Sequence, residues 1–134
     1  MLGQRRQERS FRAARMMPSL VSPCAEYADH WLVDGRDVVG VSNVRHCLTT
    51  ALRREGGNIG YGIRPTCRGR GLAHALLQHT LEEARTLGLE EAWLTCAKTN
   101  VASIRTIVGN GGVLASEEYL EHRGEIVQRY RIVL

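Results

Sequence analysis

A strand, a glycine-containing turn and a helix follow one another directly within residues 59–87, and this junction constrains the fold most strongly. Apolar residues alternate with small ones over 59–63, which is typical of a strand, and Pro65 ends the pattern. After the turn, apolar residues recur with a helical period over 72–87, and Gly88 provides a stop signal. A strand that leads directly into an amphipathic helix predicts an α/β domain.

Further strands and a second helix are expected on both sides of this junction. Strand formers in residues 27–33 and 38–44 flank Asp34-Gly35, which predicts a hairpin. The other expected elements are a loop or short helix over 46–56, a strand over 92–97, a helix over 101–108 capped by Thr99 or Asn100, and a terminal hairpin of 113–120 and 125–134. This order favours a mixed α/β fold over a repeating βαβ fold.

The charge of the chain is concentrated at its N-terminus. The chain has 134 residues and a formal net charge of +4, and residues 1–15 hold five arginines against one glutamate. Basic and acidic residues balance over 16–134. We therefore expect 1–26 to be a basic arm, helical or poorly ordered, and 27–134 to form one domain. Without a basic face on the domain, nucleic acid binding is not favoured, although a nucleic acid-associated module acting through residues 5–15 stays open.

Cysteine and histidine spacings do not match the common metal-binding motifs. The four cysteines are 20 or more residues apart, so no Cys-x-x-Cys pair exists, and the histidines form no His-Glu-x-x-His motif. No apolar run approaches the roughly 18 residues that cross a bilayer, and no secretory signal precedes the first strand. We expect a cytoplasmic protein with no metal site and no membrane association.

The turn between the strand and the helix is suited to an anion. Gly69 and Gly71 would let a phosphate approach the main chain, and the first amides of a helix are unpaired and electropositive. Three or four such amides could hold a pyrophosphate, since each bond to a charged oxygen contributes about 1.5–3 kcal/mol. Arg68 and Arg70 add positive charge. Two known phosphate motifs fail here, because His74 replaces the third glycine of Gly-x-Gly-x-x-Gly and no Gly-Lys-Ser/Thr is present.

Two motifs in this order resemble those of the GNAT superfamily of N-acetyltransferases. Residues 68–73 form the pattern Arg-x-x-Gly-x-Ala, which is similar to the acetyl-CoA signature of that superfamily. The asparagine-led segment 99–105, followed by Asn-Gly-Gly-Val-Leu at 110–114, resembles its second motif. The resemblance covers residues 30–134 and is close to a bacterial subgroup of predicted acetyltransferases. It implies a GNAT-like, mostly antiparallel sheet flanked by helices, with a shortened N-terminal part.

The resemblance also implies acetyl-CoA as the acetyl donor and a site for it. The strand before the turn would bind the pantetheine arm and the acetyl carbonyl, the turn would bind the pyrophosphate, and the start of the second helix would approach the thioester. The residues implied to bind this cofactor are Ile63, Arg64, Arg68, Gly69, Arg70, Gly71, Leu72, Ala73, Asn100 and Ser103. The implied activity is that of an N-acetyltransferase, in which a primary amine attacks the thioester directly. The sequence leaves the identity of the amine open.

The residues for proton transfer depart from the family pattern. Asn58 stands where many members have a glutamate on the strand, and an amide cannot accept a proton at neutral pH. Glu55 and His46 are nearby candidates for the catalytic base, acting through water. Ile107 stands where relatives often carry a tyrosine in the second helix, and Tyr119 could replace it only if the last hairpin covers the site. A CoA-binding protein with weak or no catalysis is therefore the alternative.

The expected N-terminal part is short for this family. A full GNAT fold begins with a strand and one or two helices that build the wall of the acceptor site, whereas about 26 residues precede the first strand expected here. Either the chain is a shortened version, or a neighbouring subunit supplies the wall in a homodimer.

Overall fold

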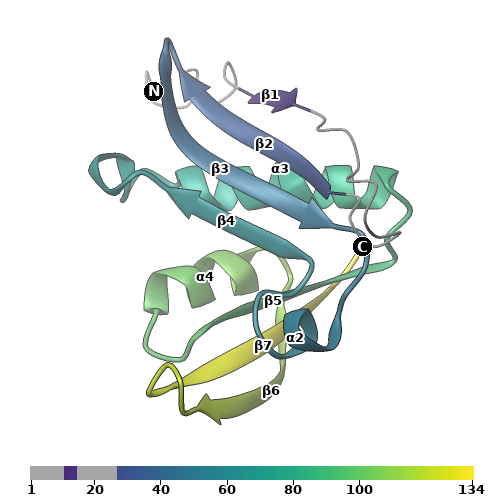
Figure 1. Cartoon of the computed structure of the whole chain (residues 1–134). Coiled ribbons are helices and arrows are strands. Elements are labelled where there is room, and N and C mark those ends of the chain that lie inside the picture. The colour runs from purple at the N-terminus through teal and green to yellow at the C-terminus, as the bar shows by residue number, and fades with distance from the viewer. Residues whose placement is uncertain (1–10, 15–26) are drawn as a thin grey trace.

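The computed structural model describes residues 11–14 and 27–134, and from residue 27 onward the strands and helices follow the expected order (Figure 1). Its elements are β1 (Phe11–Ala14), β2 (Tyr27–Asp34), β3 (Asp37–Arg45), α2 (Thr50–Arg54), β4 (Ile59–Ile63), the 3-10 turn η1 (Pro65–Cys67), α3 (Leu72–Thr86), β5 (Glu91–Ala97), α4 (Val101–Gly109), β6 (Val113–Leu120) and β7 (Glu125–Val133). The two hairpins, the strand on each side of α3 and both longer helices confirm the predicted pattern. The α/β class is confirmed with it.

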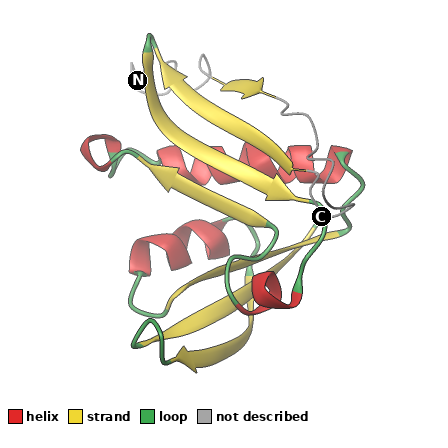
Figure 2. Cartoon of the chain, viewed as in Figure 1, coloured by secondary structure: helices red, strands yellow, loops and turns green. Residues whose placement is uncertain are grey.

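The strands form two antiparallel sheets, which Figure 2 shows in yellow. The first sheet has the order β1-β2-β3-β4, and the second has the order β5-β7-β6. Helix α3 runs across one face of the first sheet, and α4 lies beside β4 on the side of the second sheet (Figure 1). The sheets meet at an isolated bridge between Gly57 and Leu94. The expected sheet is therefore divided between β4 and β5.

Helix α3 forms where the helical period was found, and its apolar stripe is buried. The buried residues of α3 are Leu76, Leu77, Thr80, Leu81 and Ala84. Thr80 is accommodated in this stripe because its hydroxyl donates to Leu76 O (2.7 Å) and lies 2.7 Å from Ser42 Oγ of β3.

No helix in the described part of the chain is long and apolar enough to span a membrane.

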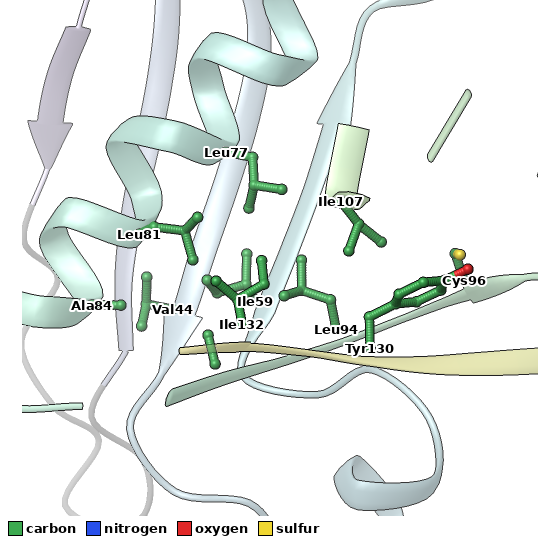
Figure 3. Close-up of a cluster of buried hydrophobic side chains, with 11 residues drawn as sticks. Val44, Ile59, Leu77, Leu81, Ala84, Leu94, Cys96, Ile107, Tyr130 and Ile132 are labelled. Atoms are coloured by element: carbon green, nitrogen blue, oxygen red, sulfur yellow. The ribbon is translucent and has the colours of Figure 1, made fainter. Parts of the chain in front are cut away.

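One hydrophobic core joins both sheets to both longer helices (Figure 3). Its buried members are Val44, Ile59, Leu77, Leu81, Ala84, Ala92, Leu94, Cys96, Ile107, Tyr130 and Ile132. They come from β3, β4, α3, β5, α4 and β7, so the core fixes the two sheets relative to each other although few main-chain bonds connect them. Ile107 has no exposed surface in this core. The family's tyrosine position is thus occupied here by a packing residue.

The N-terminal arm contains a strand where a helix or poor order was expected. Residues 11–14 form β1 and pair antiparallel with β2, Phe11 lying opposite Leu32. The expectation is wrong for these four residues, because strand pairing is decided by a distant partner strand rather than by local composition. The rest of the arm lies outside the described residues. The division of the chain at residue 26 and the module proposed for residues 5–15 stay predictions.

Candidate functional site

The gap between β4 and β5 is lined by the free edges of both sheets. β4 is the last strand of the first sheet, and Arg64 N donates to Val39 O of β3 (2.7 Å). In an antiparallel ladder the main-chain groups of successive residues point to opposite sides, so those of every second residue point to the same side. With this register, the main-chain groups of Tyr61 and Ile63 point away from β3 and toward β5. A ligand in the gap can therefore add its hydrogen bonds to a sheet edge.

Asn58 closes the gap at one end. Its side-chain Nδ2 donates to Arg45 O (3.0 Å), and its Oδ1 accepts from Trp93 N (2.9 Å). Its main chain bonds the same two residues, since Asn58 N donates to Trp93 O (2.7 Å) and Arg45 N donates to Asn58 O (2.6 Å). Asn58 is 4% exposed. The amide at the family's glutamate position thus ties β3 to β5, a role that the sequence pattern did not indicate.

The close approach of the sheets at this point requires the glycine that precedes Asn58. Gly57 has φ +66°, and a Cβ there would lie 2.2 Å from Trp93 O. Any larger residue would push β5 away from Asn58.

The turn before α3 presents bare main chain, as predicted. Gly71 caps the helix with φ 74° and makes no side-chain cap bond. The first helical bond runs from Ala75 N to Gly71 O (3.3 Å), so the amides of Leu72 and Ala73 precede the ladder and have no helical acceptor. A Cβ on Gly69 would meet no heavy atom within 4 Å. The turn is therefore open to a ligand oxygen from outside.

A cavity of about 610 Å³, called here the turn pocket, lies between this turn, β4 and α4. It is lined by Tyr61, Gly62, Ile63, Cys67, Arg68, Gly69, Gly71, Leu72, Ala73, His74, Asn100, Ala102, Ser103, Arg105 and Thr106. Eight of the ten residues implied for the cofactor are among them, and Arg64 and Arg70 are not. Gly62 keeps the strand side open, since a Cβ there would meet nothing within 4 Å. Their functional role stays a prediction, but the structure does bring these eight residues together.

Two of the implied residues are held by local contacts. Asn100 is the N-cap of α4, its Oδ1 accepting from Ser103 N (3.2 Å). Ile63 O accepts a hydrogen bond from Arg68 Nε (3.3 Å). The main-chain N–H of Ile63 is therefore the group of that residue left facing the gap.

A second cavity, of about 410 Å³, lies beyond the gap and is called here the α2-side pocket. It is lined by Arg45, Glu55, Gly56, Ile59, Gly60, Tyr61, Thr95, Cys96, Ala97, Asn100, Ser103, Arg123 and Val127. Tyr61, Asn100 and Ser103 also line the turn pocket. The two cavities therefore adjoin at these three residues, within the gap between the sheets.

A tyrosine hydroxyl lies at this junction, at a position that the sequence reasoning missed. Tyr61 Oη lies 2.7 Å from Ser103 Oγ, which joins β4 to the start of α4. Burial raises the pKa of Tyr61, and the hydrogen bond with Ser103 opposes that rise in part. Its hydroxyl is consequently protonated at neutral pH. The alternation within β4 was visible in the sequence, but nothing there related Tyr61 to Ser103.

The two candidate bases lie in different cavities. Glu55 lines the α2-side pocket, where it is paired with Arg123 Nη1 and with His122 Nε2 (3.0 Å). The hydrogen bond from Arg123 lowers the pKa of Glu55, so this carboxylate is ionised at neutral pH. His46 lines a separate cavity, and its Nε2 lies 3.1 Å from Leu87 O. Nearness in sequence did not bring these two side chains to one site.

The structure does not place Tyr119 at the gap. It lies on β6 with 60% of its surface exposed, and neither pocket is lined by it.

Within the described ranges, no group of three or more His, Cys, Asp or Glu side chains is arranged to hold a metal ion.

Comparison with known proteins relates the chain to one family. The family model described as "Acetyltransferase (GNAT) family" matches residues 4–108, which begins inside the expected arm. A search of curated proteins found no match.

Solved structures with the same fold include several bacterial proteins. yncA from Salmonella typhimurium, solved with its cofactor acetyl-CoA, has a TM-score of 0.65 and 19% identity over 81% of this chain and 65% of its own. An acetyltransferase of the GNAT family from Streptococcus pneumoniae has a TM-score of 0.68 and 19% identity over 81% and 67%. A variant of the spermidine N-acetyltransferase SpeG from Vibrio cholerae has a TM-score of 0.65 and 18% identity over 85% and 68%. The chain thus spans less than two thirds of yncA, and at these identities the similarity establishes the fold alone.

Proposed function

Because this chain belongs to the acetyltransferase (GNAT) family, we propose that it transfers an acetyl group from acetyl-CoA to a primary amine. The observation that carries the proposal is the meeting of two cavities at an open gap between sheet edges. One cavity has the bare helix-start turn on its wall, and the other approaches the same gap from α2. A donor and an acceptor can therefore reach one point from two sides.

The turn pocket has the features that acetyl-CoA needs. The free amides of Leu72 and Ala73, with Arg68 beside them, suit the pyrophosphate, and the open surface at Gly62 suits the pantetheine arm. The edge amide of Ile63 would then bind the arm as an added strand would. Acetyl-CoA supplies a thioester whose acetyl carbon an amine can attack. These assignments, with Arg64 and Arg70 as flanking charges, remain proposals.

The acceptor side must remove a proton from the amine. An alkylammonium with a pKa near 10.4 needs roughly 4 kcal/mol to lose its proton at neutral pH. Glu55 is the proposed base, because it lines the α2-side pocket and is ionised, although its lowered pKa limits its basicity and favours transfer through water. His46 is the second candidate and would need a longer water chain from its separate cavity.

The leaving side must place a proton on the sulfur. Tyr61 Oη, bonded to Ser103 Oγ, holds a proton at the junction of the two cavities and is the group we assign to this step. The ammonium first gives one proton to the base. As the amine nitrogen then bonds to the acetyl carbon and the C–S bond breaks, Tyr61 Oη gives its proton to the sulfur and recovers one from the nitrogen. Tyr61→Phe should then lower kcat more than it changes the affinity for acetyl-CoA.

The test is release of free thiol from acetyl-CoA in the presence of a panel of primary amines. Turnover above the rate of hydrolysis with at least one amine supports the proposal. The alternative is a CoA-binding protein without catalysis, which the amide at Asn58 and the packing residue Ile107 would suit. Acetyl-CoA binding without turnover on any amine would support that alternative instead.

A cytoplasmic location and a homodimer stay predictions.

A further inference from the structure

Arg45 is a half-buried arginine without an acidic partner in the described part of the chain. Its Nη1 donates to the main-chain oxygen of Gly57 (3.0 Å), and none of the ion pairs among the described residues includes it. Other arginines do pair with glutamates, namely Arg54, Arg123, Arg129 and Arg131. The charge of Arg45 is therefore available to a ligand.

This guanidinium lies on the wall of the α2-side pocket, close to β4. A Cβ on Gly60 would lie 3.0 Å from Asn43 Oδ1 and 3.8 Å from Arg45 Nη2, so both side chains approach the main chain of β4 at this glycine. Both glycine and arginine line the pocket. The guanidinium thus borders the same cavity that Tyr61 also lines.

The charged residues of this pocket do not balance. Glu55 is its acidic lining residue, and it is already paired with Arg123 and His122. Arg123 in turn also bonds Glu125 Oε1 (2.8 Å). The described lining therefore carries one uncompensated positive charge, at Arg45, which attracts an anion and repels a second ammonium group.

We propose that the acceptor is an amino acid-like amine, whose carboxylate binds Arg45 while its amine lies toward Tyr61. The proposal rests on the proposed acetyl transfer and names the class of its acceptor. A carboxylate can accept two parallel hydrogen bonds from a guanidinium, and such pairs are stronger than neutral hydrogen bonds. Polyamines of the same length place a cation against Arg45 and are disfavoured. Arg45 is thus a specificity-determining residue.

The experiment compares three amines that have the same four-carbon chain and differ only at the far end. 4-Aminobutyrate ends in a carboxylate, butylamine in a methyl group, and 1,4-diaminobutane in a second ammonium. We expect kcat/KM to be about tenfold to a hundredfold higher for 4-aminobutyrate than for butylamine, and lowest for the diamine. Equal values for 4-aminobutyrate and butylamine, or a preference for the diamine, would overturn the proposal.

A binding measurement tests the same claim without catalysis. 4-Acetamidobutyrate should bind the CoA-saturated protein about tenfold or more tightly than N-butylacetamide, which has the same amide and no charge. Arg45→Gln should remove this preference in both binding and kcat/KM. Arg36→Gln is the matched control, because Arg36 is an exposed residue of the β2–β3 turn that does not line the pocket, and it should retain the preference.

The outcomes separate this proposal from the proposed function. Absence of acetyl transfer to any amine, with the carboxylate preference in binding intact, would refute the transferase and leave the Arg45 site standing. Transfer to amines without any carboxylate preference would refute the Arg45 site and leave the transferase standing. Should Arg45→Gln fail to fold, the three amines and two amides on the unaltered protein still decide the question.

Discussion

Replacing Asn58 with alanine should destabilise the fold more than any other change of a single polar side chain at the gap. The substitution leaves two main-chain groups without partners, the N–H of Trp93 and the C=O of Arg45, which now lie 2.9 and 3.0 Å from the Asn58 amide. An orphaned buried polar group costs about 1–3 kcal/mol, so the expected loss in free energy of unfolding is about 2–6 kcal/mol. Access of water to these partly buried bonds favours the lower half of that range.

The assay is equilibrium unfolding in urea, with Asn43→Ala as the matched control. Asn43 Oδ1 accepts one hydrogen bond, from Gly60 N (3.1 Å), on the paired side of β4. Losing that bond should cost only about 0.5–1.5 kcal/mol. Asn58→Asp adds a test of direction, because a carboxylate can still accept from Trp93 N–H but cannot donate to Arg45 C=O. This variant should regain stability as the pH falls and the acid becomes protonated.

The contrary result is a loss in free energy of unfolding for Asn58→Ala that is no larger than the loss for Asn43→Ala. That result would mean that the two side-chain hydrogen bonds of Asn58 do not hold β3 and β5 together, and that other contacts close the gap.

Three further predictions concern single residues. Gly71→Glu should abolish acetyl-CoA binding in calorimetry through clash and repulsion, whereas Arg70→Ala should only weaken it, and equal effects would argue against capture by the main chain. Burial lowers the pKa of His30 below its ordinary 6.5, so the unfolded chain binds more protons than the folded chain. The contribution of His30 to stability should be full above pH 6.5 and fall as the pH drops below 6.5. His30→Phe should remove this pH dependence in urea titrations. Gly57→Ala should destabilise the fold by at least about 2 kcal/mol, since its Cβ would lie 2.2 Å from the carbonyl oxygen of Trp93 in β5. In Gly62→Ala the new Cβ meets open space, so this variant should keep its stability and bind acetyl-CoA more weakly.

Elements whose structure is decided by local signals could be predicted from the sequence. The helical period predicted α3, Asp34-Gly35 predicted the hairpin of β2 and β3, and Asn100 caps α4 as one of the two predicted caps. The glycine and arginine spacing placed the turn of the turn pocket correctly, because a helix start exposes its amides wherever it occurs. These features depend on neighbours a few residues away.

The rest depends on contacts between distant residues. Asn58 bonds partners 13 and 35 residues away, and Tyr61 meets Ser103 across 42 residues. None of these separations produces a signal in a local sequence pattern. The sequence therefore indicated no structural role for Asn58 and did not identify Tyr61 as a site residue. For the same reason the sequence did not predict that Glu55 and His46 would line different cavities.

Titration calorimetry with acetyl-CoA asks whether the bare turn and the open gap hold the donor. We expect one molecule bound per chain, with a dissociation constant between about 1 µM and 1 mM. Binding should be lost in Gly71→Glu while circular dichroism shows that this variant is folded. If the folded protein gives no heat of binding at 1 mM acetyl-CoA, which is roughly the upper end of that range, the bare turn does not hold the donor.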